Sequence, residues 1–216
     1  MLTLYEELFL LTIHEDKGTL MPSKADALRF GQAGAILAEL ALLKKIGLKD
    51  NQRLELIDPA PTGDALLDKA LQTLSAAQKE HKYGYWIDVL SQKPEKIHRR
   101  LANRLVEKGL VTQEDERLLW VIPYASSPDP NASAKVGMKN RIRALVLASA
   151  QAELREIALL SLVKACDFLD LVFVRDECKL ASRRIHELVV GEALKNPALQ
   201  TIEVISAAIE TVVEED

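Results

Sequence analysis

The residues best suited to chemistry in this sequence form a run of cations on one predicted helix. Pro94 favours a helix start, because proline is best tolerated in the first turn. Lys96, Arg100 and Arg104 follow at intervals of four and therefore share a face. Guanidinium groups match phosphate oxygens well, so this face is typical of an anion site, although a merely solvated face has the same composition. The whole cluster comprises Lys93, Lys96, His98, Arg99, Arg100 and Arg104.

A second group of cations follows the clearest loop in the sequence, residues 125–131. Serine, proline and asparagine crowd that stretch, as is typical of a turn. Lys135, Lys139, Arg141 and Arg143 come soon after it. Like the first cluster, this group could contact a phospholipid head group.

Signs of catalysis or of a metal site are missing from the sequence. It has no phosphate-binding, dinucleotide-binding, serine-hydrolase or zinc-protease motif. His14 and its acidic neighbours fit a polar helix end as well as a metal site. Asp64 and Asp68 could pair as acid and base, but a helix N-terminus with Thr62 as its N-cap explains them better. We therefore predict no enzyme, no cofactor and no metal ion.

A mainly helical chain must position these residues. The stretch Gly31–Gly47 has almost no polar face, which predicts a central core helix ending at Gly47. Alternating leucines around residues 49–52 predict one β-hairpin, and residues 117–122 predict a second. We expect a single globular multi-helix domain over residues 1–216. Further helices are predicted at 134–150, 152–165, 167–174, 176–190 and 202–213.

Composition limits the cellular setting and the partners. The 216 residues carry a net charge of -4, which gives no overall attraction to nucleic acid or to an anionic membrane. Any such binding needs a local basic patch. Cys166 and Cys178 lack a CxxC spacing and are predicted to be free thiols in a reducing compartment. The N-terminus does not have the pattern of a secretory signal, so we expect a cytoplasmic protein.

Several motifs in the first half of the sequence are specific in combination. They are Leu2–Leu8, Leu37–Leu42, Ala60–Asp68, Trp86–Ile87 and Arg100–Gly109. In order and spacing they resemble the Golgi phosphoprotein 3 family, whose eukaryotic members are peripheral membrane proteins that bind phosphatidylinositol-4-phosphate. The resemblance implies a mainly helical domain with hairpins and binding to an anionic phospholipid surface. It also implies a prokaryotic relative without the basic N-terminal arm of the eukaryotic members.

The resemblance further implies where a lipid head group would bind. The family's pocket uses a tryptophan before the central helix, an arginine within it and two arginines three residues apart ahead of the Leu-Val-Glu-Lys-Gly motif. The matching positions here are Lys24, Ala33, Glu95 and His98. Arg29 lies one turn before Ala33, and Arg99 directly follows His98, so both are substitutes for the lost arginines. The expected head-group residues are Lys24, Arg29, His98, Arg99 and Arg100.

Two other functions remain open from the sequence. In some family members a hairpin mediates self-association, and Arg117, Trp120 and Tyr124 occupy that place here, so the chain could be a homo-oligomeric scaffold without lipid binding. A helix followed by a hairpin also resembles a winged helix that binds DNA. The acidic turn 113–116 disfavours nucleic acid, because it would repel the phosphate backbone.

Overall fold

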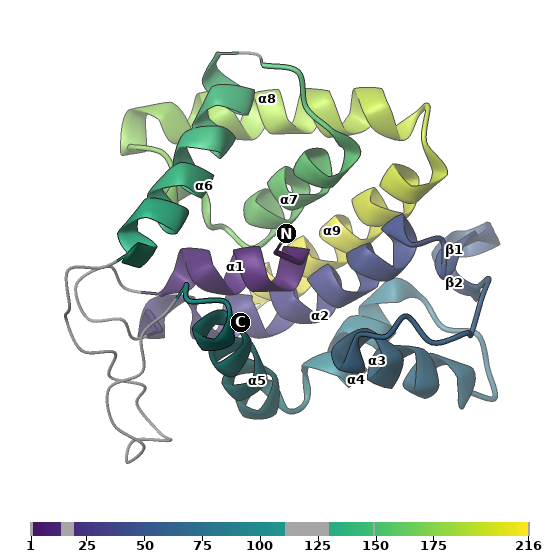
Figure 1. The fold of residues 1–216 in the computed structure, drawn as a ribbon. Coiled ribbons are helices and arrows are strands. Elements are labelled where there is room, and N and C mark those ends of the chain that lie inside the picture. The colour runs from purple at the N-terminus through teal and green to yellow at the C-terminus, as the bar shows by residue number, and fades with distance from the viewer. Residues whose placement is uncertain (1, 14–19, 111–129, 149, 216) are drawn as a thin grey trace.

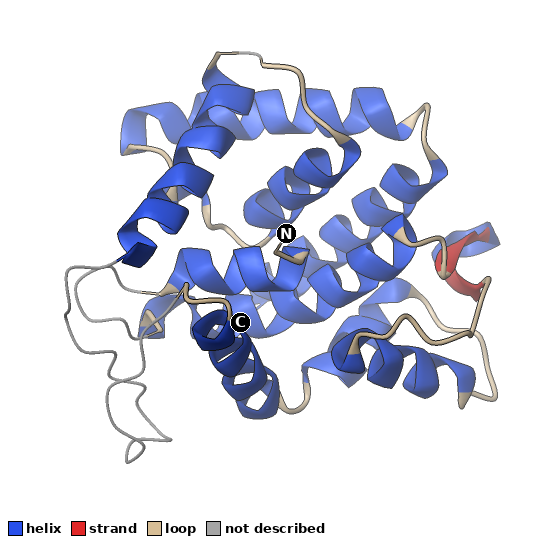
Figure 2. Cartoon of the chain, in the orientation of Figure 1, coloured by secondary structure: helices blue, strands red, loops and turns tan. Residues whose placement is uncertain are grey.

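A computed structural model describes residues 2–13, 20–110, 130–148 and 150–215. Figure 2 shows that helices dominate this part of the chain, with one small pair of strands at its edge. This confirms the predicted mainly α class. The elements are α1 (Leu4–Thr12), η1 (Pro22–Lys24), α2 (Ala25–Leu42), β1 (Ile46–Lys49), η2 (Asp50–Gln52), β2 (Arg53–Leu56), α3 (Ala65–Ser75), α4 (Tyr83–Ser91), α5 (Pro94–Glu107), α6 (Pro130–Leu147), α7 (Leu154–Ala165), η3 (Leu169–Leu171), α8 (Arg175–Ala193) and α9 (Pro197–Glu215).

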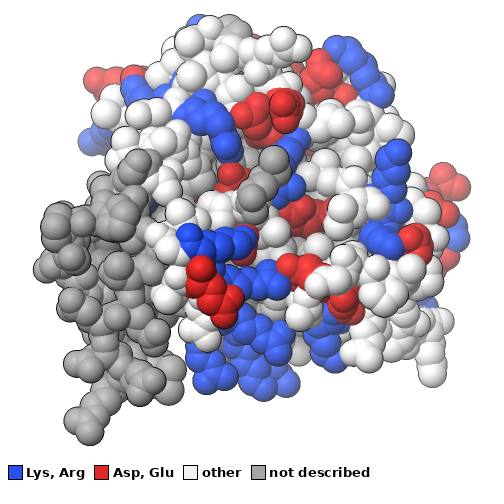
Figure 3. Space-filling view, viewed as in Figure 1, with Lys and Arg blue, Asp and Glu red and all other residues white. Residues whose placement is uncertain are grey.

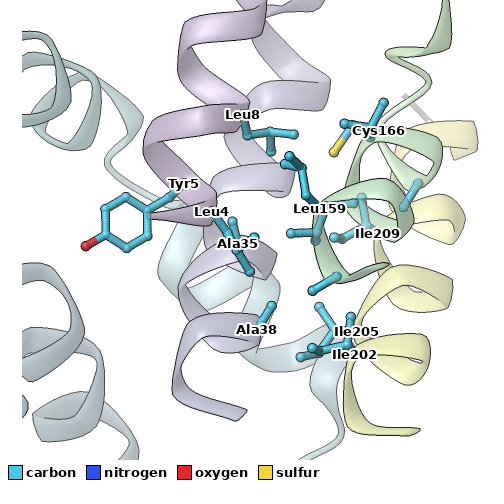
Figure 4. Close-up of a cluster of buried hydrophobic side chains, with 14 of the residues drawn as sticks. Leu4, Tyr5, Leu8, Ala35, Ala38, Leu159, Cys166, Ile202, Ile205 and Ile209 are labelled. Atoms are coloured by element: carbon cyan, nitrogen blue, oxygen red, sulfur yellow. The ribbon is translucent and has the colours of Figure 1, made fainter. Parts of the chain in front are cut away.

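Helix α2 is the centre of the fold, as its apolar sequence predicts. Every residue from Phe30 to Ala41 is buried. Helices α1, α4, α7 and α9 pack around it (Figure 1). Figure 4 shows Ala35 and Ala38 of α2 within a cluster to which α1, α7 and α9 contribute larger side chains, among them Leu4, Leu159 and Ile205. Small residues on α2 therefore let the surrounding helices approach it closely.

Gly34 marks one of the two closest approaches to α2. A Cβ atom there would lie 2.3 Å from Cδ1 of Ile209 on α9. We expect Gly34→Ala to destabilise the protein by about 1–2 kcal/mol, since overpacking outweighs the better helix propensity of alanine. Urea unfolding measures this. Gly137→Ala on α6 is the matched control, because nothing lies within 4 Å of its added Cβ, and it should be neutral or stabilising. Equal effects of the two variants would contradict the close approach.

The end of α2 corrects the predicted helix boundary. The helix stops at Leu42 and not at Gly47. Lys44 takes the left-handed conformation, with φ of 56°, and the amide of Lys45 donates to the carbonyl of Leu40 at 2.8 Å. This is a Schellman-type helix end, although glycine usually occupies the left-handed position. Gly47 instead lies in β1, where the missing side chain leaves room for Ile57.

The first hairpin forms where the sequence predicts it. Strands β1 and β2 pair antiparallel, with Leu48 opposite Leu54, across the turn 50–52. The second predicted hairpin, with Arg117, Trp120 and Tyr124, lies outside the described residues. The predicted helix at 167–174 is wrong, because only the short turn η3 forms there. Within the described part of the chain, none of the helices has the length and apolar content needed to cross a bilayer.

Candidate functional site

Helix α5 presents a cationic surface, which we call the basic face of α5 and define as Lys93, Lys96, Arg99 and Arg100. All four residues are exposed. Figure 3 shows lysine and arginine side chains gathered over the position of α5 in Figure 1. In the part of the chain that the structure describes, no carboxylate forms an ion pair with any of these four side chains. The face therefore carries four positive charges that an external anion can neutralise.

The amphipathic sequence of α5 creates this face. Leu101, Ala102 and Leu105 are buried in the core, and helical spacing turns Lys96 and Arg100 to the opposite side. Pro94 stands in the first turn, as predicted. Hydrophobic burial of one side thus fixes which side of α5 the cations occupy.

Arg104 does not contribute a free charge to this face, although its spacing groups it with Lys96 and Arg100. Its guanidinium lies 2.7 Å from Oδ2 of Asp64, and its Nη1 also donates to the Tyr5 hydroxyl at 3.1 Å. The Tyr5 hydroxyl in turn donates to Asp64 at 2.8 Å. Figure 4 shows the Tyr5 ring pointing away from the apolar cluster around α2. Arg104 is therefore occupied in tying α5 to α1 and to the start of α3.

Asp64 is the shared acceptor of these hydrogen bonds, and its position corrects the predicted N-cap of α3. Asp64, and not Thr62, is the N-cap of α3: its Oδ1 accepts hydrogen bonds from the amides of Leu66 and Leu67. Burial alone would raise the pKa of Asp64, but the hydrogen bonds from Arg104 and Tyr5 hold that pKa below its ordinary range. Asp64 is thus a capping and bridging carboxylate.

A second ion pair fixes the direction in which α5 runs. Lys108, just beyond α5, lies 2.7 Å from Glu6 of α1, whose side chain is only 1% exposed. Further towards the start of α5, the His98 ring stacks on Phe9 of α1 at 5.7 Å between centroids. These contacts hold the end of α5 beside Glu6 and its first half against Phe9, so α5 crosses α1 and does not run alongside it (Figure 1).

Lys24 belongs to another part of the surface. Its Nζ lies 2.8 Å from Asp170 and donates to the carbonyl of Asp167 at 2.9 Å, and it also sits over the Phe168 ring. These contacts place Lys24 against the connection between α7 and α8. Its charge is therefore already paired there with a carboxylate, unlike the exposed arginines of α5.

The two remaining expected head-group residues are only partly accessible. The Arg29 guanidinium lies 4.2 Å from the centroid of the Phe30 ring, and its Nε is buried. His98 is also half-buried, with a buried Nε2. Of the five expected residues, the structure brings Arg99 and Arg100 together on an open surface, whereas Lys24, Arg29 and His98 pack against neighbouring rings.

The second basic group predicted from the sequence serves the fold. Lys135 is buried and donates to the carbonyl of Ile13. Arg141 lies 2.8 Å from Glu7 of α1, and Arg143 forms a two-pronged ion pair with Glu177 of α8. These cations hold α6 against its neighbours, so they are poor candidates for a head-group site. Among the described residues, no group of three acidic, histidine or cysteine side chains has the arrangement of a metal site.

Comparison with known proteins agrees with the motifs. The family model described as Golgi phosphoprotein 3 (GPP34) matches residues 4–205. The chain is 29% identical to vacuolar protein sorting-associated protein 74 of Eremothecium gossypii over 166 residues, which is 68% of this chain and 49% of that protein. It is 30% identical to the Schizosaccharomyces pombe protein of the same name over 161 residues, or 65% and 47%. The chain thus spans about half the length of these relatives. Because the family model covers nearly all of it, the chain belongs to the Golgi phosphoprotein 3 family.

Proposed function

We propose that this protein associates with membranes peripherally by binding anionic phospholipid head groups, phosphatidylinositol-4-phosphate or another, through the basic face of α5. The observation that carries the proposal is the set of four exposed cations without an ion pair among the described residues. Family membership supports it. A net charge of -4 gives the rest of the molecule no such attraction, so orientation on a membrane would follow from this face.

Electrostatics sets the expected strength of this binding. Each lysine or arginine near an anionic bilayer contributes about 1 kcal/mol. Four of them would give reversible binding that weakens as salt screens the charges. A protein held in this way would leave the membrane readily when the surface charge of the bilayer falls.

Neutralising two of the four cations tests the proposal. We expect Arg99→Gln with Arg100→Gln to weaken binding to anionic vesicles about 30-fold, because two contributions of about 1 kcal/mol are lost. Co-sedimentation with phosphatidylcholine vesicles containing phosphatidylglycerol measures the partition coefficient. Arg175→Gln with Lys179→Gln on α8 is the matched control, since it removes the same charge from two other exposed positions.

The control decides how the result is interpreted. Equal weakening in both double variants would mean that only the net charge matters, and would contradict a site on α5. Binding that is unchanged in the α5 variant would also contradict it. No sedimentation of the unmodified protein with any anionic vesicle would favour the scaffold without lipid binding.

A further inference from the structure

We infer that the basic face of α5 recognises the charge of an anionic bilayer and not the structure of one head group. The inference rests on the proposed function and deepens it. It would make phosphatidylglycerol as good a ligand as a phosphoinositide when the two surfaces carry equal charge. The shape of the face and the engagement of the neighbouring cations both support this reading.

The four residues of the face lie on the exposed outer side of α5, with Lys93 at its N-cap. Lys96 and Arg100 are one helical turn apart, so the Cβ atoms of this pair lie roughly 5–6 Å apart. All of them are exposed. A site selective for one head group needs donors that converge in a concave pocket and are held by packing. A row of exposed cations on the outer side of one helix suits several lipids at once.

The cations that packing does hold are already bound to other groups. Arg104 lies 2.7 Å from Asp64, and Lys108 lies 2.7 Å from the buried Glu6. A phosphate group at these cations would compete with a carboxylate that also serves the fold. The ordered positive charges on this side of the molecule are therefore structural.

The positions that correspond to the family's pocket do not assemble a phosphate site here either. Ala33 has no exposed surface and no polar side-chain atom. Lys24 is engaged by Asp170, in the connection between α7 and α8. His98 stacks on Phe9, with Nε2 buried. A head group placed among these residues would have no group of accessible donors, whereas the basic face of α5 has four.

If the face recognises charge alone, lysine can replace its two arginines without loss of binding. A guanidinium binds phosphate with two parallel hydrogen bonds, and lysine cannot replace that geometry. Where only charge matters, lysine is equivalent. Arg99→Lys with Arg100→Lys should therefore bind anionic vesicles within about twofold of the unmodified protein, whereas the corresponding glutamine variant loses about 30-fold.

The test compares vesicles of equal surface charge, one set containing phosphatidylglycerol and the other phosphatidylinositol-4-phosphate, in neutral phosphatidylcholine. We expect partition coefficients within about twofold of each other, the same decline of both with salt, and retention by the lysine variant. Soluble inositol 1,4-bisphosphate and inorganic phosphate, added at matched ionic strength, should not compete, because each offers a single anion rather than a charged surface.

Three results would overturn the inference while leaving the proposed function intact. They are a preference of about tenfold or more for the phosphoinositide at equal charge, loss of binding in the lysine variant, and competition by soluble inositol bisphosphate. The proposed function itself fails if no anionic vesicle sediments the protein. Binding of duplex DNA without any vesicle binding would overturn both and would favour the winged-helix alternative.

Discussion

Replacing Arg155 with methionine is expected to lower the free energy of unfolding by about 3 kcal/mol, the lower end of the range for breaking a buried ion pair. The Arg155 guanidinium on α7 lies 2.5 Å from Glu39 of α2 and also donates to the carbonyl of Leu2. The Glu39 side chain is only 5% exposed, so the variant would leave its charge without an ion-pair partner in the core. Partial exposure of Arg155 lets water reach the pair and keeps the effect at the lower end. Urea unfolding measures the loss.

A solvent-exposed ion pair on α8 serves as the control. Arg183 and Glu187 on α8 are 3.9 Å apart, and both side chains are more than 60% exposed. Arg183→Met should change stability by less than about 0.5 kcal/mol. A comparable loss in the two variants would show that burial of Glu39 is not what makes Arg155 important.

A double variant separates the lost interaction from the stranded charge. Adding Glu39→Leu to Arg155→Met removes the uncompensated carboxylate, and we expect it to recover more than half of the lost stability. Recovery would be incomplete, because Glu39 also accepts a hydrogen bond from the Leu4 amide at the start of α1. Further destabilisation by the second substitution would contradict this account.

The sequence predicts elements that follow the common local patterns, and it misplaces features where a residue departs from its usual role. Three features are predicted correctly because each depends on near neighbours along the chain. They are the apolar run of α2, Pro94 at the start of α5 and the leucines of the first hairpin. The end of α2 is predicted wrongly. Gly47 resembles a helix stop signal, but the residue in the left-handed conformation is Lys44.

The same limit applies to the basic residues. Arg104 and Arg141 look like surface cations in the sequence, yet Arg104 hydrogen-bonds to Tyr5 and Arg141 to Glu7, partners 99 and 134 positions away. Composition reveals a charge but not a partner at such separation. Only the resemblance gave a hint, since Tyr5, Asp64 and Arg104 all fall within its motifs. The structure shows that these motifs meet, and so explains their combination through packing.

Asp64→Ala, at this meeting point, is expected to destabilise the protein by about 2–4 kcal/mol. Loss of the N-cap of α3 costs about 1 kcal/mol. The Arg104 guanidinium and the Tyr5 hydroxyl also lose their shared acceptor, which costs about 1–3 kcal/mol more for partly buried groups. Asp26→Ala is the control, because Asp26 is an exposed carboxylate in the first turn of α2 and should contribute less than about 1 kcal/mol.

The pH dependence of the Asp64→Ala effect tests whether the charge itself matters. The pKa of Asp64 is lower in the folded protein than its ordinary value of 3.8, because hydrogen bonds from Arg104 and Tyr5 outweigh the effect of burial. A carboxylate with a depressed pKa stabilises the fold above its unfolded pKa and loses that contribution as pH falls through the folded pKa. The stability difference between the unmodified protein and Asp64→Ala should therefore be constant near neutral pH and shrink below 3.8. A difference that stays constant in acid would mean that Asp64 acts through the shape of the turn, and that its charge does not hold α5 to α1.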